Sequence, residues 1–177
     1  METLLSLIVL LSLLSFLLKS SFHPLWGRTL AAFALASAVF FAVPWLTRQS
    51  PAALSAWTSS PDHLLDGAVC VVLEALLMGA FCFSRPAGRW RLLQFYPGLL
   101  AFPAVVRAWA QLLYARPGID FTLFAFLAAG VTLLLAFGGA SLMRRVLQEE
   151  SSRLELLFLI NLFLLLLTVA ATGAITF

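Results

Sequence analysis

The sequence predicts an all-α, polytopic integral membrane protein with about six transmembrane helices and both termini outside. Of the 177 residues 62% are hydrophobic and only 11% are charged, and the mean hydropathy is +1.02. Soluble domains carry about 25% charged residues, so the composition excludes an ordinary soluble protein. The apolar residues form long runs, and the basic residues stand singly or in small groups beside them.

Six apolar runs have the length of a transmembrane helix, which needs about 20 residues to cross a hydrocarbon layer of about 30 Å. The predicted spans cover residues 2–18, 29–47, 64–84, 92–115, 120–143 and 154–177, within a single transmembrane domain over residues 1–177. The first run has the alternative interpretation of a cleaved signal peptide. We favour a span, because Glu2 replaces the usual basic start and no small-residue cleavage pattern precedes Lys19.

Lysine and arginine indicate the orientation of the spans. The first, third and fifth connections contain eight basic residues, whereas the second and fourth contain only Arg48 and Arg116. The eight are Lys19, Arg28, Arg85, Arg89, Arg91, Arg144, Arg145 and Arg153. Because basic connections remain in the cytoplasm, the odd-numbered connections are predicted inside and both termini outside. We expect the arginines of the third and fifth connections to contact cytoplasmic partners or anionic lipid.

Glu74 is the only charged residue in the middle of the predicted third span. A carboxylate near the bilayer centre costs at least a few kcal/mol, so it should have a partner or a task. Arg107 of the fourth span lies at a similar predicted depth, and Gln111 follows one turn later. We therefore expect a Glu74–Arg107 ion pair that Gln111 can join. A structural role is favoured over ion or proton movement, and contact with a partner protein or snorkelling of Arg107 are further alternatives.

Helix packing should follow the small and polar residues of the spans. Gly67, Cys70, Glu74, Met78 and Cys82 recur at three- and four-residue spacing, so we expect this face of the third span to contact protein rather than lipid.

The fourth span is interrupted at Pro97 with Gly98 and again at Pro103. Each proline should bend the helix. Broken helices at membrane depth can line transporter sites, but a kink that packs around neighbouring helices is the commoner outcome.

The last span carries Glu155 near its cytoplasmic edge and Asn161 deeper in the membrane. Both are predicted to make polar contacts between helices. Before this span, residues 144–153 are expected to extend the fifth span as a helix until a turn at Ser151 and Ser152.

Motifs for catalysis, metal binding and phosphate binding are absent from the sequence. It contains no CxxC, no HExxH, no histidine pair at i, i+4 and no glycine-rich phosphate loop. His23 and His63 are predicted at opposite membrane surfaces, which argues against a haem held by two histidines. The basic residues form no nucleic-acid-binding face. We expect a non-enzymatic protein without a cofactor, metal or nucleic-acid partner.

Three segments resemble a family of small inner-membrane proteins associated with the ExbB and ExbD type of energy-transducing motor in some Gram-negative bacteria. They are FYPGLLAFP (Phe95 to Pro103), LLDGAVCVVLEALL (Leu64 to Leu77) and SRLELLFLINLF (Ser152 to Phe163). The resemblance implies a multi-pass accessory subunit of the inner membrane. Such a subunit would pack beside ExbB/ExbD-like stator proteins of a motor that uses the proton motive force for TonB-dependent outer-membrane uptake.

The chain is not expected to be a motor stator itself. It lacks the large cytoplasmic region of ExbB-like subunits and the periplasmic domain of ExbD-like subunits. The residues alone also allow a second function, that of a small transporter or channel with a polar intramembrane site at Glu74, Arg107 and Gln111.

Overall fold

The computed structural model describes residues 2–50, 52–53, 56, 61–83, 96, 98–115 and 118–173. All regular secondary structure in these residues is helical, which confirms the predicted class. The helices are α1 (Glu2–Ser21), α2 (Leu25–Leu46), α4 (Pro61–Phe83), α6 (Ala101–Ala115), α7 (Phe121–Val146) and α8 (Glu150–Gly173).

Five of these helices, all except α6, are long and apolar enough to cross a membrane. They correspond to the predicted first, second, third, fifth and sixth spans. The predicted fourth span, 92–115, is helical only from Ala101 within the described residues. With 15 residues, α6 is roughly 22 Å long, which is shorter than the hydrocarbon layer of about 30 Å. Six crossings and their orientation stay predictions.

The late start of α6 follows from its local sequence. Gly98 has a φ of +110°, a conformation that side chains disfavour, and Leu100 O accepts the first helical hydrogen bond, from Ala104 N at 3.1 Å. Pro103 therefore lies in the first turn, where its missing N–H leaves no helical hydrogen bond unmade. The interruption expected at Pro103 is instead part of the helix start.

The start of α7 is capped by Asp120, whose Oδ1 accepts hydrogen bonds from Leu123 N at 3.2 Å and Thr122 N at 2.7 Å. These bonds stabilise the charged form and lower the pKa of Asp120. The other end of α7 departs from the expectation of a helix up to Ser151. Helix α7 ends at Val146 and α8 begins at Glu150, so three residues, 147–149, separate the two helices.

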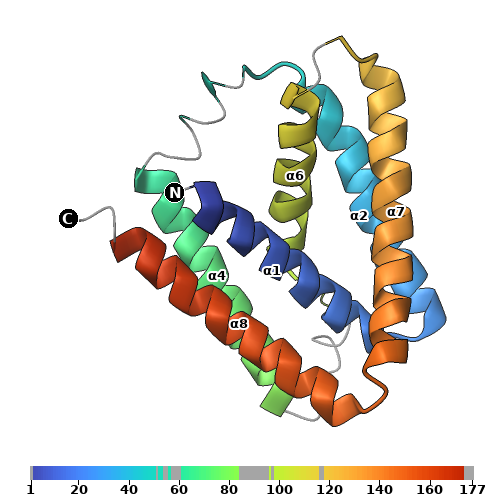
Figure 1. Ribbon diagram of the computed structural model, residues 1–177, viewed down its shortest axis with the longest axis vertical. Helices are drawn as coiled ribbons and strands as arrows, with labels where there is room; N and C mark the ends of the chain where they lie inside the picture. Colours follow the sequence, from blue (N-terminus) through green and yellow to red (C-terminus); the bar gives the residue numbers. More distant parts are fainter. Residues whose placement is uncertain are drawn as a thin grey trace.

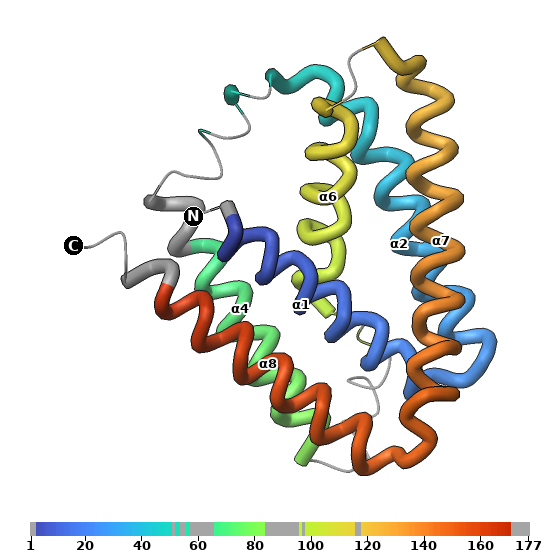
Figure 2. Tube along the Cα trace, in the orientation of Figure 1, coloured from blue at the N-terminus to red at the C-terminus, as the bar shows by residue number. Residues whose placement is uncertain are grey.

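Helix α1 occupies the middle of the arrangement (Figures 1 and 2). It contacts α2, α6 and α7 on one side and α8 on the other, and α4 packs against α8. Two hydrophobic cores result. Phe16 of α1 belongs to the core shared with α2, α6 and α7, whereas Leu18 belongs to the core shared with α4 and α8. The second core is built by Leu18, Val71, Met78, Phe81, Leu157, Ile160 and Leu164.

The row predicted to contact protein is buried in part on α4, because Glu74 and Met78 are buried and Cys82 is half-buried. Gly67 and Cys70 are exposed, whereas Val71, Met78 and Phe81 are buried. The larger apolar side chains fill the contact with α8 and α1, and this rotates the small residues outward.

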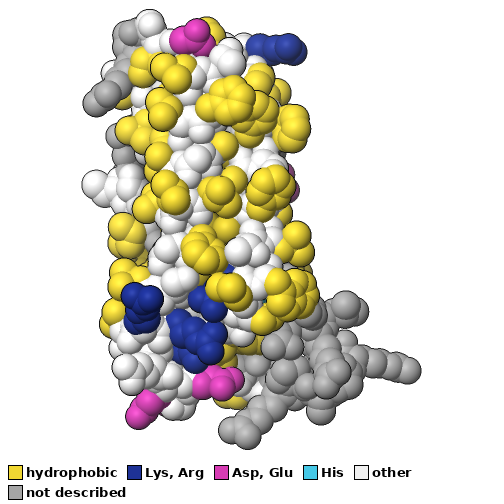
Figure 3. Space-filling model, turned by 90° about the vertical axis from the view of Figure 1, so that its right-hand side faces the viewer, with side chains coloured by type: hydrophobic (Ala, Val, Ile, Leu, Met, Phe, Trp, Pro, Cys, Tyr) yellow, Lys and Arg dark blue, Asp and Glu magenta, His cyan; other side chains and the backbone are white. Residues whose placement is uncertain are grey.

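The outside of the molecule is largely apolar. Phe83 is 78% exposed, Phe41 74% and Leu134 73%. Figure 3 shows hydrophobic side chains along the length of one face, while most of its charged side chains gather near the two ends. A surface of this kind suits contact with lipid and is far more apolar than that of a soluble monomer.

Candidate functional site

Twelve polar or charged side chains are buried in the described part of this apolar protein. They are Ser12, Ser15, Lys19, Ser20, Ser21, His23, Arg28, Glu74, Thr132, Arg153, Asn161 and Thr168. Buried polar groups need partners in lipid more than in water. Their contacts therefore show where the helices are joined and where a polar site exists.

Glu74 forms a buried polar contact within α4. It is 3% exposed and lies nine residues before the end of α4, or roughly 14 Å along the helix axis. Its Oε2 accepts hydrogen bonds from the Tyr96 hydroxyl at 2.6 Å and from Leu99 N at 2.7 Å. Leu99 N also lies 2.7 Å from the Tyr96 hydroxyl oxygen. The carboxylate thus binds the chain immediately before α6.

Gly98 makes this close approach possible. A Cβ atom at Gly98 would lie 2.9 Å from Glu74 Oε1, closer than such contacts allow. The start of α6, with its unpaired N–H groups, carries partial positive charge. Glu74, a residue of α4, therefore caps the chain segment that leads into α6.

The expected ion pair between Glu74 and Arg107 is not formed in the structure. Arg107 is half-buried, and its Nε is buried without a hydrogen-bond partner. The cause is the break before α6, which places the beginning of that helix against Glu74. Arg107 lies six residues after Ala101, roughly 9 Å further along the axis. Gln111 is exposed and joins no hydrogen-bond network with described residues, so the three predicted site residues are not gathered.

Lys19 is the base whose charge interacts with Glu74. It is 0% exposed, its Nζ lies 2.7 Å from the centroid of the Phe81 ring, and it has no hydrogen-bond partner among the described residues. The sequence predicts Lys19 in a connection, because the first apolar run stops at residue 18. The missed signal is the row Ser12, Ser15 and Lys19, whose spacing puts all three on one face of α1.

Two polar contacts join α8 to α1. Asn161 Nδ2 donates to Ser15 Oγ at 2.9 Å and to Leu157 O of its own helix at 2.8 Å. Arg153 Nη1 donates to Ser21 O at 3.2 Å and Ser21 Oγ at 3.3 Å. Glu155, the other residue expected to make such a contact, is exposed.

Arg153 also departs from its predicted place on the cytoplasmic surface, because it is only 8% exposed. The reason is that α8 begins at Glu150, so Arg153 lies in the first turn beside the end of α1. The last carbonyl groups of a helix have no helical partner, and Ser21 O accepts from Arg153 instead. The guanidinium carbon lies 4.8 Å from the centroid of the Phe22 ring, which adds a cation–π contact.

Three further arginines, Arg28, Arg144 and Arg145, lie where α2 begins and α7 ends. Arg28 is 8% exposed, and its Nη1 donates to Ser141 Oγ at 3.3 Å. Arg144 and Arg145 are exposed in the last turn of α7. Burial, together with the positive charges of Lys19 and Arg28, lowers the pKa of His23.

The arginines predicted in the third connection, Arg85, Arg89 and Arg91, lie outside the described residues.

Comparison with protein-family models, curated proteins and solved structures finds no match to this chain.

Proposed function

We propose that this chain is a non-enzymatic membrane subunit that binds a transmembrane helix of a larger complex in the groove between α1 and α6. The groove has a volume of about 420 Å³. It is lined by Ser6, Val9, Leu10, Leu13, Leu14, Leu17 and Gln111.

Gln111 is the observation that carries the proposal. Its carboxamide is exposed on a mostly apolar helix, and it makes no hydrogen bond to any described residue. In lipid an unpaired amide is unfavourable, because hydrocarbon offers neither donor nor acceptor. A partner helix with a hydrogen-bonding side chain at the same depth would satisfy it.

The α1 wall of the groove gives the partner its shape. Leucine and valine side chains form most of this wall, and Ser6 adds an exposed hydroxyl at one end. A helix with small or apolar residues on one face and one Ser, Thr, Asn or Gln would pack here. The buried contacts at Glu74, Asn161 and Arg153 would keep the bundle rigid while the partner binds.

The resemblance of three segments to proteins associated with ExbB and ExbD motors makes such a motor the first complex to test. In that setting the chain would be an accessory, scaffolding subunit of a bacterial inner membrane. The support for this choice is the resemblance, whereas the support for a helical partner is the geometry of Gln111.

The test is site-specific photo-crosslinking in membranes. A crosslinking amino acid at position 111 should give one discrete product with a larger membrane protein. The matched control is position 112, because Leu112 lies on the same helix at the same depth but on another face, and is 52% exposed. Equal or absent crosslinking at both positions would contradict the proposal, as would undiminished co-purification of the partner by a Gln111→Leu variant.

A second candidate function is a small transporter or channel, and the burial of two opposite charges that act on each other, Glu74 and Lys19, favours it. Glu74 contacts Tyr96 and Leu99, which are not helical, and non-helical chain at membrane depth can line transporter sites. Flux of protons or ions into vesicles containing the purified protein should then fall in a Glu74→Gln variant. Absence of flux from the native protein under any gradient would remove this candidate.

A further inference from the structure

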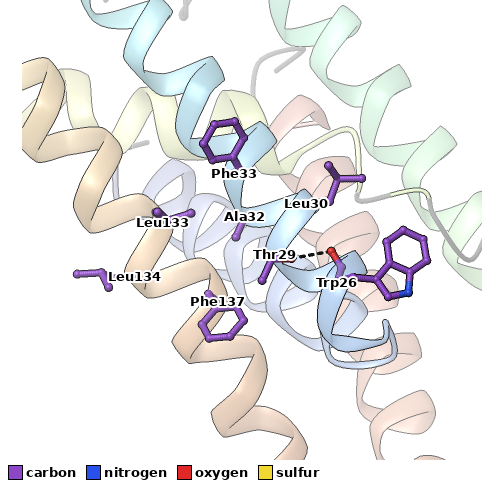
Figure 4. A pocket seen from close by; sticks show the side chains of 8 residues that line it. All are labelled: Trp26, Thr29, Leu30, Ala32, Phe33, Leu133, Leu134 and Phe137. Carbon is purple, nitrogen blue, oxygen red and sulfur yellow. Dashed lines mark hydrogen bonds between the residues drawn. The ribbon is translucent and has the colours of Figure 1, made fainter.

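A second groove runs between α2 and α7, on the face that carries basic side chains near one end (Figures 3 and 4). It is lined by Trp26, Thr29, Leu30, Ala32, Phe33, Leu133, Leu134 and Phe137, with a volume of about 580 Å³. Figure 4 shows residues of α2 along one wall and residues of α7 along the other. The polar groups of this lining are the Trp26 indole N–H and the Thr29 hydroxyl, which donates to Trp26 O at 2.7 Å. The groove is therefore suited to a hydrocarbon chain.

Arg28 lies at one end of this groove. It stands between Trp26 and Thr29 in the sequence, and its Nη1 donates to Ser141 Oγ at 3.3 Å. Ser141 Oγ in turn donates to Phe137 O at 2.8 Å, which links the arginine to the α7 wall. Hydrogen bonds thus connect the charged end to the apolar groove.

The charge of Arg28 is not neutralised by the described part of the chain. Arg28 forms no ion pair with a described residue, and its Nε is buried without a hydrogen-bond partner. The charges that act on it are those of Arg144 and Arg153, both of the same sign. The nearby acid, Glu150, acts on Arg153. Like charges gathered in a partly desolvated place are unfavourable without a counter-anion.

We propose that the α2/α7 groove binds one anionic phospholipid, with an acyl chain between the two helices and its phosphate at Arg28 and Arg144. Arginine binds phosphate through several N–H donors, and Arg144 is exposed in the last turn of α7. This end of the bundle is the one that the basic bias assigns to the cytoplasm, where anionic headgroups attract basic residues.

The site is separate from the α1/α6 groove of the proposed function, because the two linings share no residue. Failure of one proposal therefore leaves the other unchanged.

The test uses tryptophan quenching by lipids with brominated acyl chains. One variant keeps only Trp26 and a control variant keeps only Trp45, near the other end of α2 and 52% exposed; phenylalanine replaces the other tryptophans. Each variant is placed in mixed vesicles of phosphatidylglycerol and phosphatidylcholine, with the bromine on one lipid or the other at equal content.

Trp26 should report local enrichment of phosphatidylglycerol of roughly fivefold for each arginine involved. Trp45 should be quenched equally by both lipids. Arg28→Gln with Arg144→Gln should remove the preference at Trp26, whereas Arg48→Gln, at the other end of α2, should keep it. If the Arg28 variant does not fold, Arg144→Gln alone should reduce the preference, because that side chain is exposed.

Equal quenching of Trp26 by the two lipids would overturn the proposal. Loss of the preference on addition of inorganic phosphate would also overturn it, because the site would then hold the free anion rather than the lipid.

Discussion

The Tyr96 hydroxyl donates a 2.6 Å hydrogen bond to Glu74 Oε2, and this bond joins α4 to the chain segment that leads into α6. Leu99 N donates to the same oxygen at 2.7 Å. Glu74, in the predicted third span, therefore accepts hydrogen bonds from non-helical residues that precede α6. The structure has these hydrogen bonds where the sequence predicts a salt bridge from Glu74 to Arg107.

Removal of the Glu74 carboxylate should destabilise the fold strongly. Glu74→Ala leaves the Tyr96 hydroxyl and Leu99 N without their acceptor and removes a negative charge that acts on Lys19, so we expect a loss of about 3 kcal/mol in the free energy of unfolding. Glu74→Gln keeps an acceptor and should lose about half as much. Unfolding in mixed micelles by titration with a denaturing detergent measures both. Glu155→Gln, at an exposed position, serves as control; equal effects of Glu74→Ala and Glu155→Gln would contradict the capping role.

Gly98→Ala should be more harmful than the same change at Gly118. Both glycines have positive φ, +110° and +98°, so each alanine variant should lose about 1 to 2 kcal/mol from the backbone alone. Only at Gly98 does the new Cβ meet another group, Glu74 Oε1 at 2.9 Å; nothing lies within 4 Å at Gly118. The difference between the two variants in unfolding free energy measures the carboxylate contact.

The same comparison has an internal check. In a Glu74→Ala background the two glycine variants should become equally destabilising, because the atom that opposes the Cβ is gone. A persistent excess at Gly98 would show that its effect does not come from Glu74.

Ser15 and Asn161 should be energetically coupled. A double-mutant cycle with Ser15→Ala and Asn161→Ala should give a coupling free energy of about 0.6 kcal/mol, the average for hydrogen bonds between membrane helices. The control cycle pairs Asn161→Ala with Ser12→Ala, since the Ser12 hydroxyl donates to Ile8 O of its own helix at 2.7 Å. Similar coupling in the two cycles would argue against a specific bond.

Stability should fall in mild acid because of His23. Its pKa is lowered in the folded protein by burial and by the charges of Lys19 and Arg28, so the unfolded chain binds the proton more tightly. The contribution of neutral His23 is complete above the ordinary pKa of about 6.5 and is lost as the pH falls through the folded value.

Unfolding measured as a function of pH should show this loss, and His23→Gln should flatten the profile over the same interval. An unchanged profile in that variant would assign the acid sensitivity to other groups.

Hydropathy was sufficient to predict five helices of membrane-spanning length, because each lies in one long apolar run. It could not predict where α6 begins, since the start depends on a glycine conformation and on a carboxylate from another helix. Nor could it place Lys19. A basic residue at the end of an apolar run is typical of the membrane surface. Lys19 is buried instead, because the Phe81 ring contacts its ammonium group and the charge of Glu74 acts on it.

The candidate site was predicted in part for the same reason. Glu74 was recognisable from its depth alone, and Asn161 from its place within an apolar helix. The partner of Glu74 was misassigned because a single sequence gives depth along a helix but not the break that shifts Arg107 away. Arg28 was predicted as a surface residue, and only the packing of α2 on α7 shows that it is buried beside Ser141.

The central position of α1 has a consequence for biogenesis. This helix is synthesised before the other described helices, yet the partners of Ser15 and Ser21 are Asn161 and Arg153, which belong to the last helix described. During synthesis the Ser15 and Ser21 hydroxyl groups therefore lack these partners until α8 has been inserted. Assembly of the bundle is thus completed only after α8 has been inserted, and chains stopped before α8 should be substrates for membrane proteases.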